Sequence, residues 1–498
     1  MRMTRKKTLI HVREFSRQAV IVIISFLLLI ALFMATIGNL EHKSYAMAFL
    51  SSCVLFVLTI IVFRTKGFEK IIKWVNRGNP IYICLILSTF CLLANGLFAF
   101  CFHPEQAADY RTFYQVAKDL ASGSHPGMKD YVAMFPHILG YSSVLSVFFR
   151  LFGQQMSVAV GLNVLLTVLS GILLFTLTLE MTDSFSATMI YLLWIICPSK
   201  MFYNTMSLSE PTYTFFILLF FWLTKQFELS MRRRVNPTIV IPYAILSGFI
   251  LTAVQATRPI GIIPILSLGL WLLFLSGQNV ERKQVKVWSG FFLVLISSFY
   301  IGNFVWREYA TKQLEQAPPS VPGYSIYVGF NLETNGSYSD TDMDLLQSRY
   351  FGEYNRNAEA TQRSMFEDAK IRIVNAKPFL SRLLPAKLCT LLGHDEGGVY
   401  YAKESLSAKQ YALGCVASNL WYYYTCLIAF MGLIQVQKKQ ECGLIIIAII
   451  FAIGLITAQL LVEVAARYHY VLISILLLIG GYAFSSRNSQ KIIYDGVK

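Results

Sequence analysis

Charged residues are scarce in this sequence. Asp, Glu, Lys and Arg make up 14% of its 498 residues, whereas a soluble domain usually carries about 25%. Apolar residues make up 55% and aromatic residues 14%. This composition excludes an ordinary soluble domain and indicates a protein that lies largely within a lipid bilayer, with aromatic side chains at both interfaces.

Common catalytic and metal-binding motifs are missing as well. The nine cysteines form no C-x-x-C pair and follow no zinc-ligand spacing. The sequence has no Gly-rich phosphate loop, no G-x-S-x-G and no H-E-x-x-H motif. No segment alternates strand and helix as a Rossmann-like domain requires. These absences exclude the enzyme classes that the motifs define, and a soluble nucleotide-sugar enzyme with them.

What the sequence does contain is a series of apolar stretches. A helix needs about 20 apolar residues to cross a bilayer. Twelve stretches reach or approach this length and predict an all-α polytopic membrane protein with about twelve transmembrane helices. They are residues 19–37, 46–63, 81–100, 158–179, 185–197, 211–224, 238–256, 260–275, 287–305, 411–434, 444–462 and 468–484.

The net charge of +15 is sorted along the chain. The loops expected inside the cell hold 23 Lys and Arg against 8 Asp and Glu, while the rest of the chain holds 20 of each. The positive-inside rule explains this asymmetry and places both termini in the cytoplasm of a multi-pass cell-membrane protein. Nucleic-acid binding is excluded, because it needs a basic face on a folded domain. The run from Arg232 to Arg234 is a topology signal or binds anionic lipid heads.

A thirteenth apolar stretch, residues 135–152, fits the topology only if it does not cross the membrane. The loops at 102–134 and 200–210 both lie outside, yet three apolar stretches separate them. With Pro136 and Gly140 near its start, residues 135–152 are expected to form an interfacial helix along the outer surface, or to dip into the membrane and return. The alternative is an ordinary span, with a different topology for residues 1–100.

The chain is predicted to have four parts. Residues 1–80 form two extra N-terminal helices, and residues 81–306 form a transmembrane core with its first outer loop at 102–134. Residues 307–409 form a small mixed extracytoplasmic domain, since turn clusters and an amphipathic stretch alternate there. Residues 410–498 form C-terminal spans and a tail. The short stretches 185–197 and 211–224 also predict a cavity opening outward near Glu210.

Candidate functional residues lie at the outer ends of the spans. Asp109 precedes an amphipathic stretch, where it is a general base or only a helix cap. Glu210 stands directly before Pro211, where it acts on a substrate or only opens the next helix.

A second group of candidate residues contains two arginines. Arg258 and Arg467 bind a phosphate or reach to the membrane interface, and Glu463 and His469 lie beside Arg467 in the sequence. The run His394-Asp395-Glu396 is expected to be a solvated turn rather than a metal site, because three adjacent residues rarely point at one ion.

Taken in order, these motifs resemble the membrane glycosyltransferases of the GT-C superfamily. The resemblance covers about residues 81–484 and is nearest to the bacterial branch related to protein O-mannosyltransferases and lipid A aminoarabinose transferases. One departure concerns the first loop, where related enzymes often carry a second acidic residue and this chain has Tyr110. The matching segments are Ala107 to Tyr110, Ala117 to Gly123, Tyr131, Phe135-Pro136, Ser209-Glu210-Pro211, Arg258-Pro259, Tyr327 to Asn331 and Arg467 to Tyr470.

The resemblance implies an inverting enzyme that moves a sugar from a polyprenyl-phosphate carrier to a cell-envelope acceptor on the outer face of the membrane. Asp109 and Glu210 would be catalytic. The partners would be the lipid-linked sugar donor, a glycan, lipid or protein acceptor, and membrane lipids. The residues expected to bind substrate are Arg258, Arg467, His469, Lys200, Tyr203, Tyr131 and His137.

Other functions stay open at this point. No cofactor is firmly implied, and the departure at Tyr110 leaves a divalent cation, Mg²⁺ or Mn²⁺, undecided. A transporter or flippase of lipid-linked sugars would need polar residues within the spans. A glycan polymerase or ligase would differ from a single-sugar transferase in the size of its donor. A non-catalytic membrane protein would bind a partner through its outer domain.

Overall fold

The computed structural model describes residues 14–30, 43–232, 237–274, 282–439 and 443–485, and in these residues the chain forms helices and no strand. Each of the twelve apolar stretches lies largely within a helix where it is described. The twelve helices are residues 14–30, α2 (Lys43–Phe63), α4 (Pro80–Cys101), α8 (Met156–Met181), α9 (Ser184–Ile195), α11 (Glu210–Arg232), α12 (Pro237–Thr257), α13 (Ile262–Phe274), α14 (Arg282–Leu314), α20 (Ala408–Lys438), α21 (Leu444–Leu461) and α22 (Tyr470–Phe484).

Seven of the described helices are long and apolar enough to cross a membrane, or eight if α9 and the short α10 (Pro198–Asn204) form one span bent by 56°. The helix α13 and residues 241–257 of α12 are apolar but shorter. The all-α polytopic class is therefore supported, while the count of twelve crossings stays a prediction. The two termini, expected in the cytoplasm, lie outside the described residues, as do residues 31–37 of the first predicted span.

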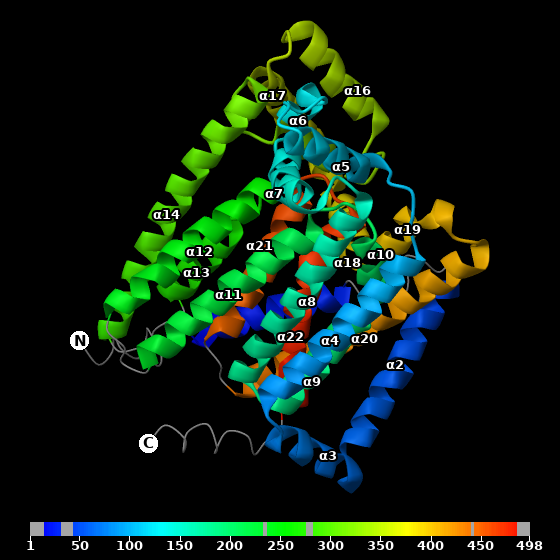
Figure 1. The fold of residues 1–498 in the computed structure, drawn as a ribbon, viewed down its shortest axis with the longest axis vertical. Coiled ribbons are helices and arrows are strands. Elements are labelled where there is room, and N and C mark those ends of the chain that lie inside the picture. Colours follow the sequence, from blue (N-terminus) through cyan, green and yellow to red (C-terminus); the bar gives the residue numbers. More distant parts are fainter. Residues whose placement is uncertain (1–13, 31–42, 233–236, 275–281, 440–442, 486–498) are drawn as a thin grey trace.

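Residues 135–152 form a helix, α7 (His137–Phe152), that packs on α5 (Ala108–Ala121), α12 and α8. Short polar helices gather at the same end of the bundle, where α5, α6 (Lys129–Met134), α16 (Asp340–Ser348) and α17 (Ala358–Ala376) lie together at the top of Figure 1. The interfacial position of α7 stays a prediction.

The described residues 307–409 contain helices joined by turns and no strand, and their place in an outer domain stays a prediction. Beyond the end of α14 the chain forms α15 (Gly323–Gly329), α16, a π-helical turn (Arg349–Glu353), α17, a 3-10 turn (Lys377–Phe379), α18 (Leu380–Leu392), α19 (Gly397–Tyr401) and a 3-10 turn (Lys403–Ser405). The turn signals join helices rather than strands. Asn335 and Gly336, for example, take φ values of 52° and 76° between α15 and α16. The boundaries of the four predicted parts stay predictions.

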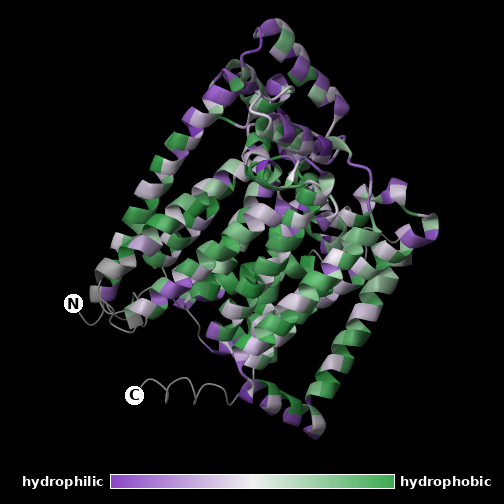
Figure 2. Cartoon of the chain, in the orientation of Figure 1, coloured by the Kyte–Doolittle hydropathy of each residue, from purple (hydrophilic) through white to green (hydrophobic). Residues whose placement is uncertain are grey.

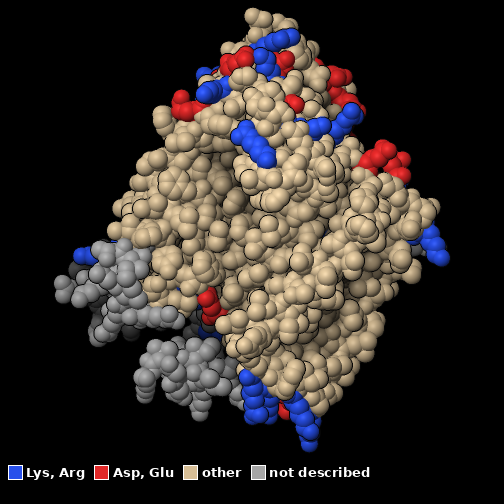
Figure 3. Space-filling model, viewed as in Figure 1, with Lys and Arg blue, Asp and Glu red and all other residues tan. Residues whose placement is uncertain are grey.

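Polarity divides the molecule along its long axis. The middle of the bundle is hydrophobic (Figure 2). Charged side chains gather at the two ends of the face in Figure 3, with both signs near α16 and mostly Lys and Arg at the α3 end. The helix α3 (Lys66–Arg77) carries four basic residues. This separation agrees with a basic cytoplasmic end and an outer end of mixed charge.

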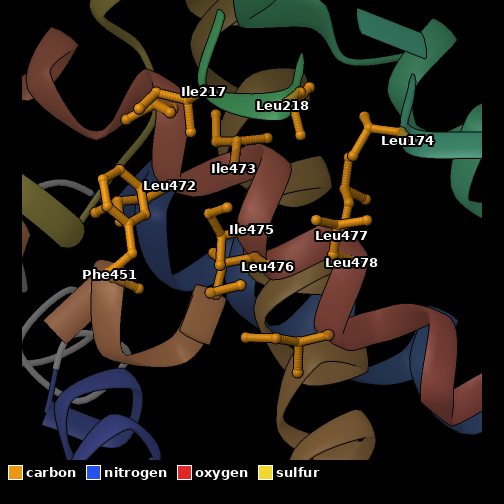
Figure 4. Packing of buried hydrophobic residues seen from close by; sticks show 14 of the residues in the cluster. Leu174, Ile217, Leu218, Phe451, Leu472, Ile473, Ile475, Leu476, Leu477 and Leu478 are labelled. Atoms are coloured by element: carbon orange, nitrogen blue, oxygen red, sulfur yellow. The ribbon is translucent and has the colours of Figure 1, made fainter. Parts of the chain in front are cut away.

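The core is built around α22, whose residues are almost all buried. Its leucine and isoleucine side chains pack against Leu174 of α8, Ile217 and Leu218 of α11 and Phe451 of α21 (Figure 4). A helix that is apolar all round belongs in the interior of a bundle. Because α22 starts where the charged residues at the outer end lie, its packing fixes the position of Arg467 just before it.

Candidate active site

Four segments that are far apart in the sequence bring charged side chains together at the end of the bundle near α5. Asp109 lies in the first turn of α5, Glu210 begins α11, and Arg258 directly follows α12. Arg467 lies in a 3-10 turn (Ala466–His469) between α21 and α22. The structure thus brings together the two predicted catalytic carboxylates and the two predicted phosphate-binding arginines.

The Arg467 guanidinium joins the two carboxylates. Its Nη2 donates a hydrogen bond to Asp109 Oδ2, and its Nε lies 3.9 Å from Glu210 Oε1. The Asp109 side chain is 26% exposed, whereas Glu210 is 1% exposed. One cation between two carboxylates makes a compact charged group with its accessible edge at Asp109. We call Asp109, Glu210 and Arg467 the Arg467 cluster.

Asp109 does not act as a helix cap. The helix α5 begins at Ala108 without a side-chain cap, and the Asp109 carboxylate bonds to Arg467 instead. Ala108 has a φ of 46°, in the left-handed region that a residue with a side chain rarely adopts. Backbone strain of this kind, costing about 1–3 kcal/mol, is found at functional sites. Here the strained residue directly precedes the carboxylate that faces Arg467.

The Arg467 cluster has unused hydrogen-bonding capacity. Within the described part of the chain, Arg467 Nε and Glu210 Oε1 have no hydrogen-bond partner although both atoms are buried. The hydroxyl of Tyr110, whose ring centroid lies 5.6 Å from the Arg467 guanidinium, has none either. Buried polar atoms are nearly always hydrogen-bonded. Unpartnered atoms of this kind around one cation indicate a place where a polar ligand binds.

Arg258 lies beside the cluster. Its guanidinium stacks on the Tyr468 ring at 4.2 Å and makes no hydrogen bond or ion pair to another described residue. Its position depends on close packing of α7 on α12, since a Cβ at Gly140 would lie 1.9 Å from the Ala256 carbonyl oxygen. A glycine at this position lets the two helices touch. Arg258 is thereby held near the site with its charge unpaired.

His137 and Tyr131 complete the group. Burial, together with the positive charge of Arg258, lowers the pKa of His137 to about 3, so the imidazole is neutral at physiological pH. The Tyr131 hydroxyl donates to Asp109 Oδ1 at 3.5 Å. Burial tends to raise the pKa of Asp109, but attraction to Arg467 outweighs it and the pKa is lowered. Asp109 is therefore ionised at neutral pH.

Three other predicted substrate-binding residues have different surroundings. The Lys200 ammonium donates to the Trp194 carbonyl and lies 4.2 Å from the Trp194 ring centroid, buried at the bend between α9 and α10. Tyr203 is buried with its ring against that of Tyr470. In the described residues neither bonds to the Arg467 cluster. Both stabilise the packing around α10 rather than line the site.

His469 likewise faces away from the cluster. Its Nδ1 bonds to the Leu391 carbonyl at 2.7 Å, its Nε2 to Asp395 Oδ1 at 3.1 Å, and its ring stacks on Tyr422. We call His469, Asp395 and the Leu391 carbonyl the His469 cluster. A histidine with both ring nitrogens bonded to the scaffold has nothing left for a substrate.

The expectation of a solvated turn at His394-Asp395-Glu396 is wrong. Asp395 is 1% exposed, and Glu396 accepts hydrogen bonds from Tyr45 at 2.5 Å and Asn419 at 3.1 Å. Helices α2 and α20 cover this turn, which local sequence does not reveal.

A divalent cation does not fit the Arg467 cluster. No group of three or more His, Cys, Asp or Glu in the described ranges is placed to hold a metal ion. The two carboxylates, Asp109 and Glu210, both face Arg467. A metal ion would have to take the place of that guanidinium.

Glu463 and Tyr324 lie near the Arg467 cluster, and no sequence pattern gives either of them a role. Glu463 precedes Arg467 by four residues, and its backbone N–H bonds to the Ser325 carbonyl at 2.7 Å. Tyr324 lies in α15, in a segment whose only sequence signal was the run from Tyr327 to Asn331. The acidic residue beside Arg467 was visible in the sequence, but its contact with α15 was not.

The sequence matches no protein-family model and no curated protein. Among solved structures, the chain is similar to the archaeal oligosaccharyltransferase AglB from Archaeoglobus fulgidus in complex with an inhibitory peptide and a dolichol-phosphate. The identity is 11% and the TM-score 0.49, over 84% of this chain and 50% of that one. A second structure, the Archaeoglobus fulgidus oligosaccharyltransferase tethered with an acceptor peptide, gives 12% and 0.46 over 85% and 50%. The chain spans about half the length of these proteins, and at such scores its function must be argued from its own residues.

Proposed function

We propose that the protein is a membrane glycosyltransferase that moves a sugar from a polyprenyl-phosphate carrier to a cell-envelope acceptor on the outer face of the membrane. The observation that carries the proposal is the Arg467 guanidinium, joined to Asp109 and 3.9 Å from Glu210, with Arg258 unpaired beside it. The group lies at the opposite end of the bundle from the basic helix α3 (Figure 1), which favours the outer side.

The donor phosphate would bind to Arg258. A guanidinium fork matches two phosphate oxygens, and this one has no competing partner among the described residues. The lipid tail would stay in the bilayer while the phosphate lies at the interface. Polyprenyl phosphate can leave without a separate proton donor, because the second pKa of a phosphate is about 6. Neutral His137 would supply a hydrogen bond without adding charge.

Asp109 would act as the general base. It is ionised, and it has the most exposed side chain of the Arg467 cluster. It would take the proton of the acceptor hydroxyl as that oxygen bonds to the anomeric carbon. The bond from that carbon to the phosphate oxygen breaks with its electron pair, and the configuration inverts. Arg467 would stabilise the charge on the leaving phosphate, while Glu210 would keep Arg467 in place and orient the acceptor.

The test compares cell-surface glycans by mass spectrometry with and without the protein, and then follows transfer from synthetic polyprenyl-phosphate sugars by the protein in nanodiscs. Asp109→Asn should lower the rate by about 10²–10⁴-fold, whereas the exposed control Glu105→Gln should leave it unchanged. A full rate with folded Asp109→Asn would contradict the proposal. Movement of an intact lipid-linked sugar across liposomes without cleavage would instead indicate a flippase.

A further inference from the structure

A third carboxylate lies near the Arg467 cluster and has no assigned role. The Glu463 side chain makes no hydrogen bond or ion pair to any described residue, although it lies close enough to Arg467, Asp109 and Arg258 for their charges to act on it. Burial raises the pKa of Glu463. A carboxyl group without a hydrogen-bond or ion-pair partner among the described residues is available to a ligand.

The backbone around Glu463 is held firmly by the outer helices. The Glu463 N–H bonds to the Ser325 carbonyl at 2.7 Å, and the Val464 N–H bonds to the Gly336 carbonyl at 2.9 Å. On the other side, the Lys387 ammonium donates to the Val462 carbonyl at 2.6 Å, and also to the carbonyls of Gly329 and Leu460. The backbone that carries Glu463 therefore has a fixed position, from which its side chain can reach a ligand.

A phenol with an unused hydroxyl lies next to this backbone. Tyr324 is 1% exposed, and its hydroxyl has no hydrogen-bond partner among the described residues. The ring of Tyr324 contacts Phe135 edge to face at 5.5 Å, and Phe135 contacts Tyr131 at 5.0 Å. Because Tyr131 bonds to Asp109, a row of aromatic rings leads from the proposed base to Tyr324.

We propose that Glu463 and Tyr324 form a subsite for a sugar ring of the acceptor, so that the acceptor is a hydroxyl-rich glycan. A carboxyl group accepts hydrogen bonds from neighbouring sugar hydroxyls, and a phenol hydroxyl donates or accepts one. The subsite lies against α15, among the outer helices, whereas the lipid-linked donor would enter from the bilayer. The inference rests on the proposed function, because it assigns the acceptor of the same site.

Binding is measured first, independently of turnover. The full-length protein in nanodiscs is mixed with methyl glycosides of glucose, galactose and mannose, and saturation-transfer NMR detects contact. At least one glycoside should give a signal that Glu463→Gln and Tyr324→Phe abolish. The exposed controls Glu404→Gln and Tyr400→Phe should keep it. No signal from any glycoside, or a signal unchanged in Glu463→Gln, would overturn the subsite even if the protein transfers sugars.

Kinetics provide the second arm once a donor is identified. Glu463→Gln should raise the acceptor KM by about 10–100-fold, the effect of losing one or two hydrogen bonds to a charged group, and leave the donor KM unchanged. Transfer to a peptide or a lipid acceptor with an unaltered KM would contradict a glycan acceptor. If no donor supports transfer, the proposed function fails, whereas the binding measurement still decides the subsite.

Discussion

Arg467 and His469 are two residues apart on one 3-10 turn, yet they belong to opposite kinds of environment. In the His469 cluster both imidazole nitrogens are bonded, the ring stacks on Tyr422, and Asp395 is 1% exposed. Its one unpartnered carboxylate atom among the described residues, Asp395 Oδ2, is buried. In the Arg467 cluster, unpartnered atoms lie next to Asp109, whose side chain is 26% exposed.

The two clusters thus differ as a structural hydrogen-bonded pair and a candidate site. Both clusters are buried and charged, so burial alone does not distinguish them. The difference is that the unused hydrogen bonds of the Arg467 cluster lie beside the partly exposed Asp109 carboxylate. Substitutions in the His469 cluster should therefore act on folding, and substitutions in the Arg467 cluster should act on the rate.

The largest expected effect on stability comes from His469→Ala. It leaves the Asp395 carboxylate buried without its partner and opens a cavity beside Tyr422, which should cost about 3–5 kcal/mol of unfolding free energy. Thermal unfolding in detergent measures the loss. Asp395→Asn is the matched control, because its amide can donate to a neutral imidazole, and it should cost clearly less. Equal losses would show that the charge of Asp395 decides the stability.

Arg467→Lys should lower the transfer rate and leave stability nearly unchanged, the reverse of His469→Ala. An ammonium keeps the charge but cannot reach Asp109 and Glu210 with a planar fork, so the transfer rate should fall about 10²-fold, as when one preorganised donor is lost. The melting temperature should change little, since a counter-ion for the two carboxylates remains. If the melting temperature fell as far as in His469→Ala, the Arg467 cluster would be a stabilising contact like the His469 cluster.

Acidification should test His137, the histidine beside the Arg467 cluster. Its pKa is about 3 in the folded protein against about 6.5 unfolded, so between these values the unfolded chain binds the extra proton. Stability should fall as pH drops below 6.5, by about 1–2 kcal/mol at pH 5. Denaturation curves at pH 7.5 and 5 measure it, with His137→Gln as the variant. A fall of equal size in His137→Gln would assign the effect to other groups.

The smallest effect is expected from an exposed ion pair at the same end of the molecule. Lys129 lies 2.8 Å from Glu315, and both side chains are more than one third exposed. Exposed pairs contribute little, so Lys129→Ala should leave the melting temperature almost unchanged and transfer intact. A loss of stability comparable to that of His469→Ala would mean that the exposure of a charged residue does not decide how much it contributes to stability.

The grouping of the charged residues at the ends of the spans could be predicted from the sequence better than the orientation of their neighbours. The sequence singles out Asp109, Glu210, Arg258 and Arg467, because charged residues at the ends of apolar spans are few. Lys200, Tyr203 and His469 were grouped with them because of their position along the chain. In the structure their side chains contact neighbouring parts of the helix bundle instead. The orientation of a side chain depends on which neighbouring helix offers a partner, and spacing along one chain does not contain that information.

The helices follow from the sequence by itself, because hydropathy acts locally and a long apolar stretch in a bilayer must satisfy its backbone hydrogen bonds within a helix. The accumulation of basic residues in alternate loops is equally local. Only the tertiary structure decided that Asp109 meets Arg467, 358 residues away, and that Asp395 is buried under α2 and α20. Such pairings depend on how the faces of separate helices pack, a property of the whole bundle rather than of any one segment.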